Sequence, residues 1–436
     1  MNVIFLTLVR INDIEERGIY QDLMRKFRDE GHNVYVLTPH EREQGSWLKV
    51  KGARLELKNG VHILTVNTLK VQKTNIVEKG VGTLLIERQF KAAIKKYLSD
   101  VKFDLITYST PPITFTNVVK YLKKENPGAV SYLQLKDIFP QNAVDIGMMT
   151  TKGAKGLLYK FFRRKERKLY AYSDYIGCMS PANVEFVLKH NSEIDAKRVE
   201  VAPNSVELNE NDNENDNQKE SRERNEWYYI RKKYNLPTDK PIFIYGGNLG
   251  KPQGIDYLIK CLDENKERTD CHFVIVGTGT ELSKLQVWYG SQSSKSKENL
   301  NQNQSTSEYS KDSKNSITVM KGLPKVDYDM LVRNCDVGLI FLDHRFTIPN
   351  YPSRLLSYLE YKIPVLCVTD VNTDIGRIAE ENGYGYWCES VKPEDFTALV
   401  DKMLAADRKA MGEKGYEFLK NNYLVEHTYN AIMKHF

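Results

Sequence analysis

Two glycine-rich turns in the sequence could hold a phosphorylated ligand. The first is YGGNLGKPQG (245–254), which follows an apolar run and opens a helical stretch. Its backbone amides, together with Lys251, could hold a diphosphate. The turn matches neither a Walker A loop nor a GxGxxG fingerprint, so it does not by itself indicate ATP or NAD. An ordinary strand-to-helix turn is the alternative interpretation.

The second glycine-rich turn is VGTGTEL (276–282), where an apolar run ends in Gly277, Thr278 and Gly279. Such a turn suits close contact with a nucleoside base or ribose. A lone Gly-Thr-Gly is weak support for this, because plain turn chemistry explains it equally well. Both interpretations stay open.

A further ligand-facing segment is IPNYPSRLLSYLEYKIPVL (348–366). Ser353 is predicted to cap a helix over 353–362, whose positive end would face the ligand, and Arg354 could add a cation. The alternative is an ordinary capped helix that buries its leucines.

A carboxylate follows another strand candidate, in LQLKDIFPQNAVDIG (133–147). Asp137 would stand at the carboxyl end of that strand, where it could act as a base or accept hydrogen bonds from sugar hydroxyls. It could equally cap a turn. The spacing does not separate these two roles.

The elements that would position these turns occur in two similar series of strands alternating with amphipathic stretches. The strand candidates span residues 2–8, 33–39, 61–66, 104–110, 129–135, 175–180 and 199–203, and then 242–247, 272–277, 317–322, 337–342 and 365–370. Nearly continuous apolar strands predict parallel sheets that are covered on both faces. The sequence therefore predicts an α/β protein with two Rossmann-like, doubly wound domains facing a cleft, in which ligands bind beyond the carboxyl ends of the strands.

Composition sets the domain boundaries. Residues 209–226 are acidic and poor in apolar residues, and residues 290–316 consist almost entirely of Ser, Asn, Gln and Lys. Both tracts are predicted to be disordered. The predicted organisation is an N-terminal domain over 1–206, a linker over 207–235, a C-terminal domain over 236–420 with a loop insertion at 290–316, and a terminal helix over 421–436 that packs back on the N-terminal domain.

Bulk composition excludes several classes of protein. The 436 residues suit two domains, and no apolar stretch is long enough for a membrane-spanning helix. The six cysteines stand alone, which argues against a zinc site or a disulfide framework and fits a cytoplasmic protein. A net charge of +6 is small for this length, and no recognition module is present, so no nucleic-acid partner is expected.

The segment 155–169 combines leucines and phenylalanines with lysines and arginines. This pattern resembles an interfacial helix that docks on anionic lipid. An amphipathic helix that packs on its own sheet, with the basic face in water, is the alternative. If the helix docks on lipid, the protein is peripheral on the inner face of the membrane.

The ordered series of motifs resembles glycosyltransferase family 4, a group of retaining GT-B enzymes that build capsule, O-antigen and other surface glycans. The motifs that carry the resemblance are Gly18, STPPITF (109–115), KDIFPQNA (136–143), KERKLYAYSD (165–174), CMSPANVEF (178–186), VAPNSVEL (201–208), YGGNLGKPQG, FVIVGTGTEL (273–282), KGLP (321–324), CDVGLIFL (335–342) and PSRLLSYLEYKIPVL (352–366). They span nearly the whole chain.

The resemblance implies a role for each matching position. The residues it implicates in donor binding are Gly18, Asn204, Gly247, Asn248, Gln253, Gly277, Thr278, Gly279, Ser353, Ser357 and Glu360. Lys251, Arg354 and the glycine-turn amides would stabilise the leaving diphosphate without a metal or cofactor. Asp137 would orient the acceptor or the sugar.

The chain departs from the family pattern at three positions. The two glutamates that the family carries eight residues apart are here Pro349 and Ser357, and Glu360 is the candidate replacement for the ribose contact. The histidine often found after the fifth strand is here Lys136.

The implied function is transfer of a hexosyl or N-acetylhexosaminyl group, with retention, from a nucleotide-sugar to a glycan or polyprenyl-linked acceptor. UDP is the default nucleotide. The alternatives are another GT-B nucleotide-sugar enzyme, such as an epimerase, and a non-catalytic member of a glycan-assembly complex.

Overall fold

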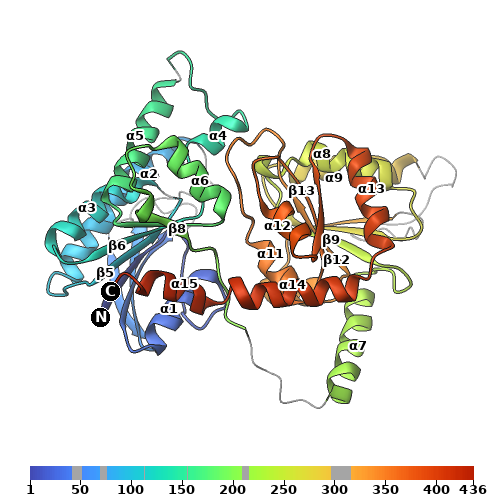
Figure 1. Cartoon of the computed structure of the whole chain (residues 1–436), viewed down its shortest axis with the longest axis horizontal. Helices are drawn as coiled ribbons and strands as arrows, with labels where there is room; N and C mark the ends of the chain where they lie inside the picture. The colour runs from blue at the N-terminus through green and yellow to red at the C-terminus, as the bar shows by residue number, and fades with distance from the viewer. Residues whose placement is uncertain (42–51, 69–75, 112, 155, 209–215, 296–315) are drawn as a thin grey trace. The chain divides into compact units, whose positions relative to one another are not determined.

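The computed structural model describes residues 1–41, 52–68, 76–111, 113–154, 156–208, 216–295 and 316–436. The chain divides into two compact units (Figure 1). Unit 1 consists of Met1–Glu207, Thr347–Tyr351 and Asn422–Phe436, and unit 2 consists of Leu208–Phe346 and Pro352–Asn421.

Unit 1 contains an eight-stranded sheet in the order β3-β4-β2-β1-β5-β6-β7-β8. Its strands are β1 (Asn2–Leu6), β2 (Asn33–Glu41), β3 (Ala53–Lys58), β4 (Val61–Thr68), β5 (Leu105–Ser109), β6 (Val130–Leu135), β7 (Tyr175–Cys178) and β8 (Val199–Val201). Neighbouring strands are parallel except for β3, which is antiparallel to β4. Residues Val3–Leu6 of β1 are fully buried, because helices cover both faces of the central strands.

The helices of unit 1 include one from the end of the chain. They are α1 (Ile19–Asp29), α2 (Ile76–Tyr97), α3 (Thr116–Glu125), α4 (Gln141–Asp145), α5 (Gly156–Tyr172), α6 (Pro181–His190) and α15 (Val425–Met433), with 3-10 turns at Ile113–Phe115 and Ala196–Arg198. The Tyr429 ring of α15 packs edge-on against Phe27 of α1, with 4.9 Å between centroids. The Tyr429 hydroxyl also bonds His32 Nε2 at 2.9 Å. The end of the chain is thus part of unit 1.

Unit 2 contains a six-stranded, fully parallel sheet in the order β11-β10-β9-β12-β13-β14. Its strands are β9 (Ile242–Asn248), β10 (His272–Thr278), β11 (Ile317–Lys321), β12 (Val337–Phe341), β13 (Val365–Thr369) and β14 (Gly385–Glu389). Its helices are α7 (Asp216–Lys233), α8 (Ile255–Asn265), α9 (Leu282–Lys295), α10 (Lys325–Arg333), α11 (Arg354–Glu360), α12 (Ile375–Glu381), α13 (Pro393–Leu404) and α14 (Arg408–Asn422), with a 3-10 turn at Lys251–Gln253. The predicted doubly wound architecture is confirmed in both units.

The structure corrects the prediction that 209–226 belongs to a disordered linker. Residues Asp216–Lys233 form α7, and only 209–215 of the tract lie outside the described residues. Arg231, which lies beyond the acidic tract, anchors the carboxyl end of this helix. Its side chain is 2% exposed, pairs with Asp336 at 2.6 Å and donates to the carbonyls of Pro237 and Lys240. These tertiary contacts hold the end of α7 against the rest of unit 2. The composition of the segment itself does not reveal them, because the partner residues lie elsewhere in the sequence.

Other element boundaries also differ from the sequence prediction. Helix α9 continues to Lys295, five residues past the predicted start of the loop insertion, and the rest of that insertion, 296–315, lies outside the described residues. Strands β3 and β14 were not predicted. The pattern of β3 is weak because it lies at the edge of its sheet and several of its side chains are exposed.

Candidate functional site

The turn after β9 is held in shape by its own polar groups. The Tyr245 hydroxyl donates to the Asn248 carbonyl at 2.8 Å. The Gln253 side-chain oxygen accepts from Asn248 Nδ2 at 3.1 Å and from the Gly250 amide at 3.2 Å. Gln253 therefore braces the turn. Its predicted contact with the donor stays a prediction.

Gly247 gives this turn its exposed backbone. Its φ of +121° lies in a region that L side chains rarely adopt, and the residue is exposed. Lys251 is also exposed, and no acidic side chain within the described ranges forms an ion pair with it. The turn thus presents open backbone and a cation at the carboxyl end of β9.

The turn after β10 lies directly against the turn after β9. The Leu249 amide donates to the Thr278 carbonyl at 2.9 Å. A Cβ atom at Gly277 would lie 1.9 Å from the Gly247 carbonyl oxygen, and one at Gly279 would lie 2.2 Å from that of Leu249. Packing between the two turns therefore requires these two glycines. Thr278 is exposed beside them, and a nucleoside contact for this turn stays a prediction.

Arg354 lies beside the glycine turn that follows β9. Its guanidinium carbon lies 4.3 Å from the centroid of the Tyr245 ring, and Nη2 would lie 3.7 Å from a Cβ at Gly247. Nη1 is buried and has no hydrogen-bond partner among the described residues. A buried guanidinium donor without an acceptor is costly, so an anion at this point would satisfy it.

The helix that carries Arg354 differs from the prediction. It spans Arg354–Glu360, shorter than the predicted 353–362. The prediction that Ser353 caps it was wrong: Ser353 has α-helical backbone angles, and its side chain accepts no capping hydrogen bond. Ser357 and Glu360 are partly buried within this helix, and their contacts with a donor stay predictions.

In unit 1, Asp137 follows β6, as the sequence predicts. The Thr110 hydroxyl oxygen accepts from the amides of Lys136 at 2.9 Å and Asp137 at 3.2 Å, which fixes the loop between them. Burial raises the pKa of Asp137 to about 6 and lowers the pKa of Lys136 to about 7. The pKa values of these two sequence neighbours, which follow β6, are thus both shifted toward neutrality.

Gly18 and Asn204 also lie in unit 1. Gly18 precedes α1, and its amide donates to Asp22 Oδ1 at 3.0 Å. Its φ of 175° is open to any residue, and a Cβ would meet only the flexible end of Gln21. Asn204 is buried after β8, and its Oδ1 has no hydrogen-bond partner within the described ranges. Asn204 is the stronger of these two candidates.

Sequence reasoning missed the residues that support the site. Tyr245 and Tyr328 pack around Arg354 and the glycine turn, and a Cβ at Gly246 would lie 2.2 Å from the Tyr328 hydroxyl. Thr110, which holds the Asp137 loop, lies in the quoted STPP motif. That motif was the available signal. The tyrosines had none, because any aromatic residue at a buried position looks like core.

The comparisons with known proteins agree with this architecture. Two α/β units, each built on a largely parallel sheet, are the architecture of the GT-B fold. Sucrose-phosphate synthase from Thermosynechococcus elongatus superposes with a TM-score of 0.68 at 12% identity, covering 99% of this chain and 97% of that chain. HepE from Anabaena, solved in complex with UDP and glucose, gives a TM-score of 0.64 at 11% identity, covering 100% and 98%. At these identities the likeness establishes the fold alone.

The sequence comparisons concern mainly unit 2. Residues 229–418 match the family model described as Glycosyl transferases group 1, and apart from 347–351 this span lies within unit 2. Most of unit 2 is therefore similar in sequence to group 1 glycosyltransferases. The probable glycosyltransferase WbjE of Pseudomonas aeruginosa is 22% identical over 303 residues, which cover 67% of this chain and 64% of that protein. The chain thus spans less than two thirds of this curated relative.

Proposed function

We propose that the protein transfers a sugar from a nucleotide-sugar to an acceptor hydroxyl. One observation carries the proposal: Arg354, with a buried Nη1 that lacks a hydrogen-bond partner in the described structure, lies beside Gly247 in the exposed glycine turn. A guanidinium next to open backbone amides is suited to a diphosphate. The group 1 family match of this domain supports the same interpretation.

In the proposed reaction, negative charge develops on the leaving nucleoside diphosphate as the glycosidic bond breaks. Arg354, Lys251 and the amides around Gly247 stabilise that charge, so no divalent metal is needed. Asp137 of unit 1 orients the acceptor or the sugar through its carboxylate. The partly buried carboxyl, with its pKa near 6, changes charge within the working pH range.

The narrower features of the proposal rest on the family resemblance. They are a hexosyl or N-acetylhexosaminyl donor, retention of configuration, and a glycan or polyprenyl-linked acceptor in cell-surface polysaccharide synthesis. UDP is the proposed nucleotide, and the UDP complex of the structurally similar HepE supports this choice.

The test is calorimetric titration of the full chain with UDP, GDP, ADP and CMP, followed by their sugar conjugates, with and without EDTA. We expect one nucleotide to bind, EDTA to have no effect, and Lys251→Ala to weaken binding. Lys260→Ala, which removes an exposed lysine from α8 of the same unit, is the matched control. If none of these ligands binds, the transferase proposal fails and a scaffold role replaces it.

A further inference from the structure

One face of α5 carries cations that the described structure does not neutralise. Lys160, Arg164 and Lys168 are exposed, they recur every four residues, and no acidic side chain in the described part of the chain pairs with them. Like charges at this spacing on a helix repel one another. An external anion would relieve that repulsion.

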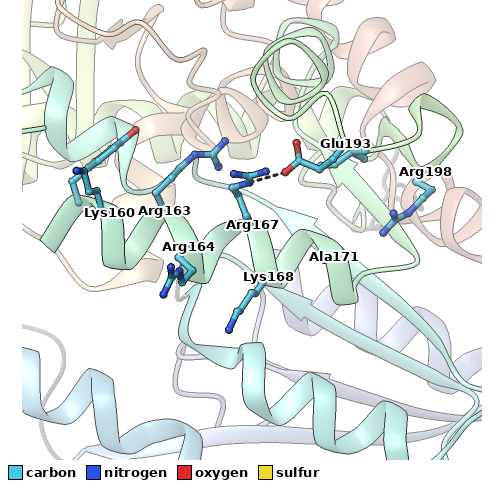
Figure 2. A pocket seen from close by; sticks show the side chains of 10 residues that line it. Lys160, Arg163, Arg164, Arg167, Lys168, Ala171, Glu193 and Arg198 are labelled. Atoms are coloured by element: carbon cyan, nitrogen blue, oxygen red, sulfur yellow. Dashed lines mark hydrogen bonds and ion pairs between the residues drawn. The ribbon is translucent and has the colours of Figure 1, made fainter. Parts of the chain in front are cut away.

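These three side chains line a groove of about 600 Å³ together with other basic side chains (Figure 2). The groove also includes Arg163, Arg167 and Arg198, and its only acidic lining residue is Glu193. Arg167 pairs with Glu193 at 2.7 Å, and Figure 2 shows Arg164 and Lys168 extending to the other side of α5 in that view. The groove therefore keeps a net positive charge after its internal pairing.

Two of the basic residues are built into the wall of this groove. Arg163 pairs with the buried Glu166 at 2.6 Å and donates to Asn191 Oδ1 at 2.6 Å. Arg198 donates to the carbonyls of Tyr170 at 3.0 Å and Asp174 at 3.1 Å. These contacts fix the shape of the groove and leave the stripe of Lys160, Arg164 and Lys168 for an outside partner.

The start of α5 exposes large apolar side chains next to these cations. The exposed fractions are 67% for Leu157, 53% for Leu158 and 42% for Phe161, and Met148 in the preceding loop is 63% exposed. Within unit 1, Figure 1 places the segment that directly follows α4 away from the sheet. The Phe161 ring packs against the neighbouring Phe162 ring, with 5.3 Å between centroids.

From this juxtaposition we propose that α5 docks on the surface of an anionic phospholipid bilayer. Leu157, Leu158 and Phe161 enter the boundary between headgroups and acyl chains, and the cations of the groove contact headgroup phosphates. Exposed leucines beside the cations favour a bilayer over a nucleic acid. Proteins bind single-stranded nucleic acids with basic side chains that contact the phosphates and aromatic side chains that stack on the nucleobases. The proposal does not depend on the transferase activity.

The test is co-sedimentation of the full chain with phosphatidylglycerol-containing vesicles and with pure phosphatidylcholine vesicles. We expect binding to the anionic vesicles alone, and a decrease as salt is raised. Replacing Lys160, Arg164 and Lys168 by alanine should lower the partition coefficient between vesicles and water about fivefold per residue. The matched control removes three exposed lysines from other helices: Lys124→Ala, Lys260→Ala and Lys409→Ala.

A second measurement locates the contact without relying on charge removal. All six native cysteines are buried, so Leu157→Cys provides one exposed thiol for an environment-sensitive fluorophore. Anionic vesicles should shift its emission to the blue and leave a label at Lys124→Cys unchanged. The proposal is overturned by equal vesicle binding of the alanine triple variant and its control, by a label at 157 that does not respond, or by binding to single-stranded RNA in place of vesicles.

Discussion

Replacing Arg354 by methionine should separate ligand binding from stability. The change removes the guanidinium and keeps a long apolar stem in contact with Tyr245. In the parent chain the buried Nη1 lacks a hydrogen-bond partner in the described structure. Removing this unsatisfied donor stabilises the variant by about 1–3 kcal/mol. Loss of the cation–π contact with Tyr245, at 4.3 Å, costs about 0.5–2 kcal/mol. The two effects partly offset, so the net change in the free energy of unfolding should lie between a loss of about 1 kcal/mol and a gain of about 2.5 kcal/mol.

Donor binding should respond differently. Losing a charge-assisted hydrogen bond to the diphosphate costs about 1.5–3 kcal/mol. That corresponds to an increase of about 10- to 150-fold in the dissociation constant of the nucleoside diphosphate.

The assays are denaturant unfolding for stability and calorimetric titration for binding. Arg333→Met is the matched control, because Arg333 is 45% exposed in the same unit and its ion pair with Glu226 is long, at 3.6 Å. A variant that loses more than about 4 kcal/mol of stability while it binds the nucleotide normally would refute the reasoning, since Arg354 would then be a structural cation.

Three further predictions concern single residues. Gly277→Ala should lower the free energy of unfolding by at least about 3 kcal/mol, because the added Cβ would lie 1.9 Å from the Gly247 carbonyl oxygen. Thermal melting measures this loss of stability. Arg231→Met should cost about 1–3 kcal/mol in denaturant unfolding, because the carbonyls of Pro237 and Lys240 lose the donor that the buried guanidinium gives them. The kcat/KM should rise as the pH passes about 6 and Asp137 ionises, and Asp137→Asn should remove that rise.

The raised pKa of Asp137 also predicts a sign for stability. The folded pKa, about 6, lies above the ordinary value of 3.8, so protonation favours the folded state. That contribution is complete below about pH 4 and is lost as the pH rises through 6. Asp137→Asn should therefore be more stable than the parent chain at pH 7, as measured by denaturant unfolding. Equal stability of the two proteins at pH 7 would argue that the carboxyl is well solvated.

The fold could be predicted because its signal is local. Buried parallel strands such as Val3–Leu6 need apolar side chains on both faces, and that requirement appears as continuous apolar runs. The glycine turns at the ends of β9 and β10 could also be predicted, because the glycines directly follow the apolar strands in the sequence. Helix α7 was missed, because the contacts that hold Arg231 come from residues up to 105 positions away.

The sequence by itself determined two doubly wound domains, the positions of their strand-end turns, and Asp137 and Arg354 as candidates. Only the tertiary structure decided what these residues touch. It brought Arg354 against Gly247 and Tyr245, gave Gln253 a bracing role, and showed that Gly277 and Gly279 are required by packing between turns. The physical reason is that periodicity reports burial along one element, whereas contacts between elements depend on a register that is fixed only when the sheet assembles.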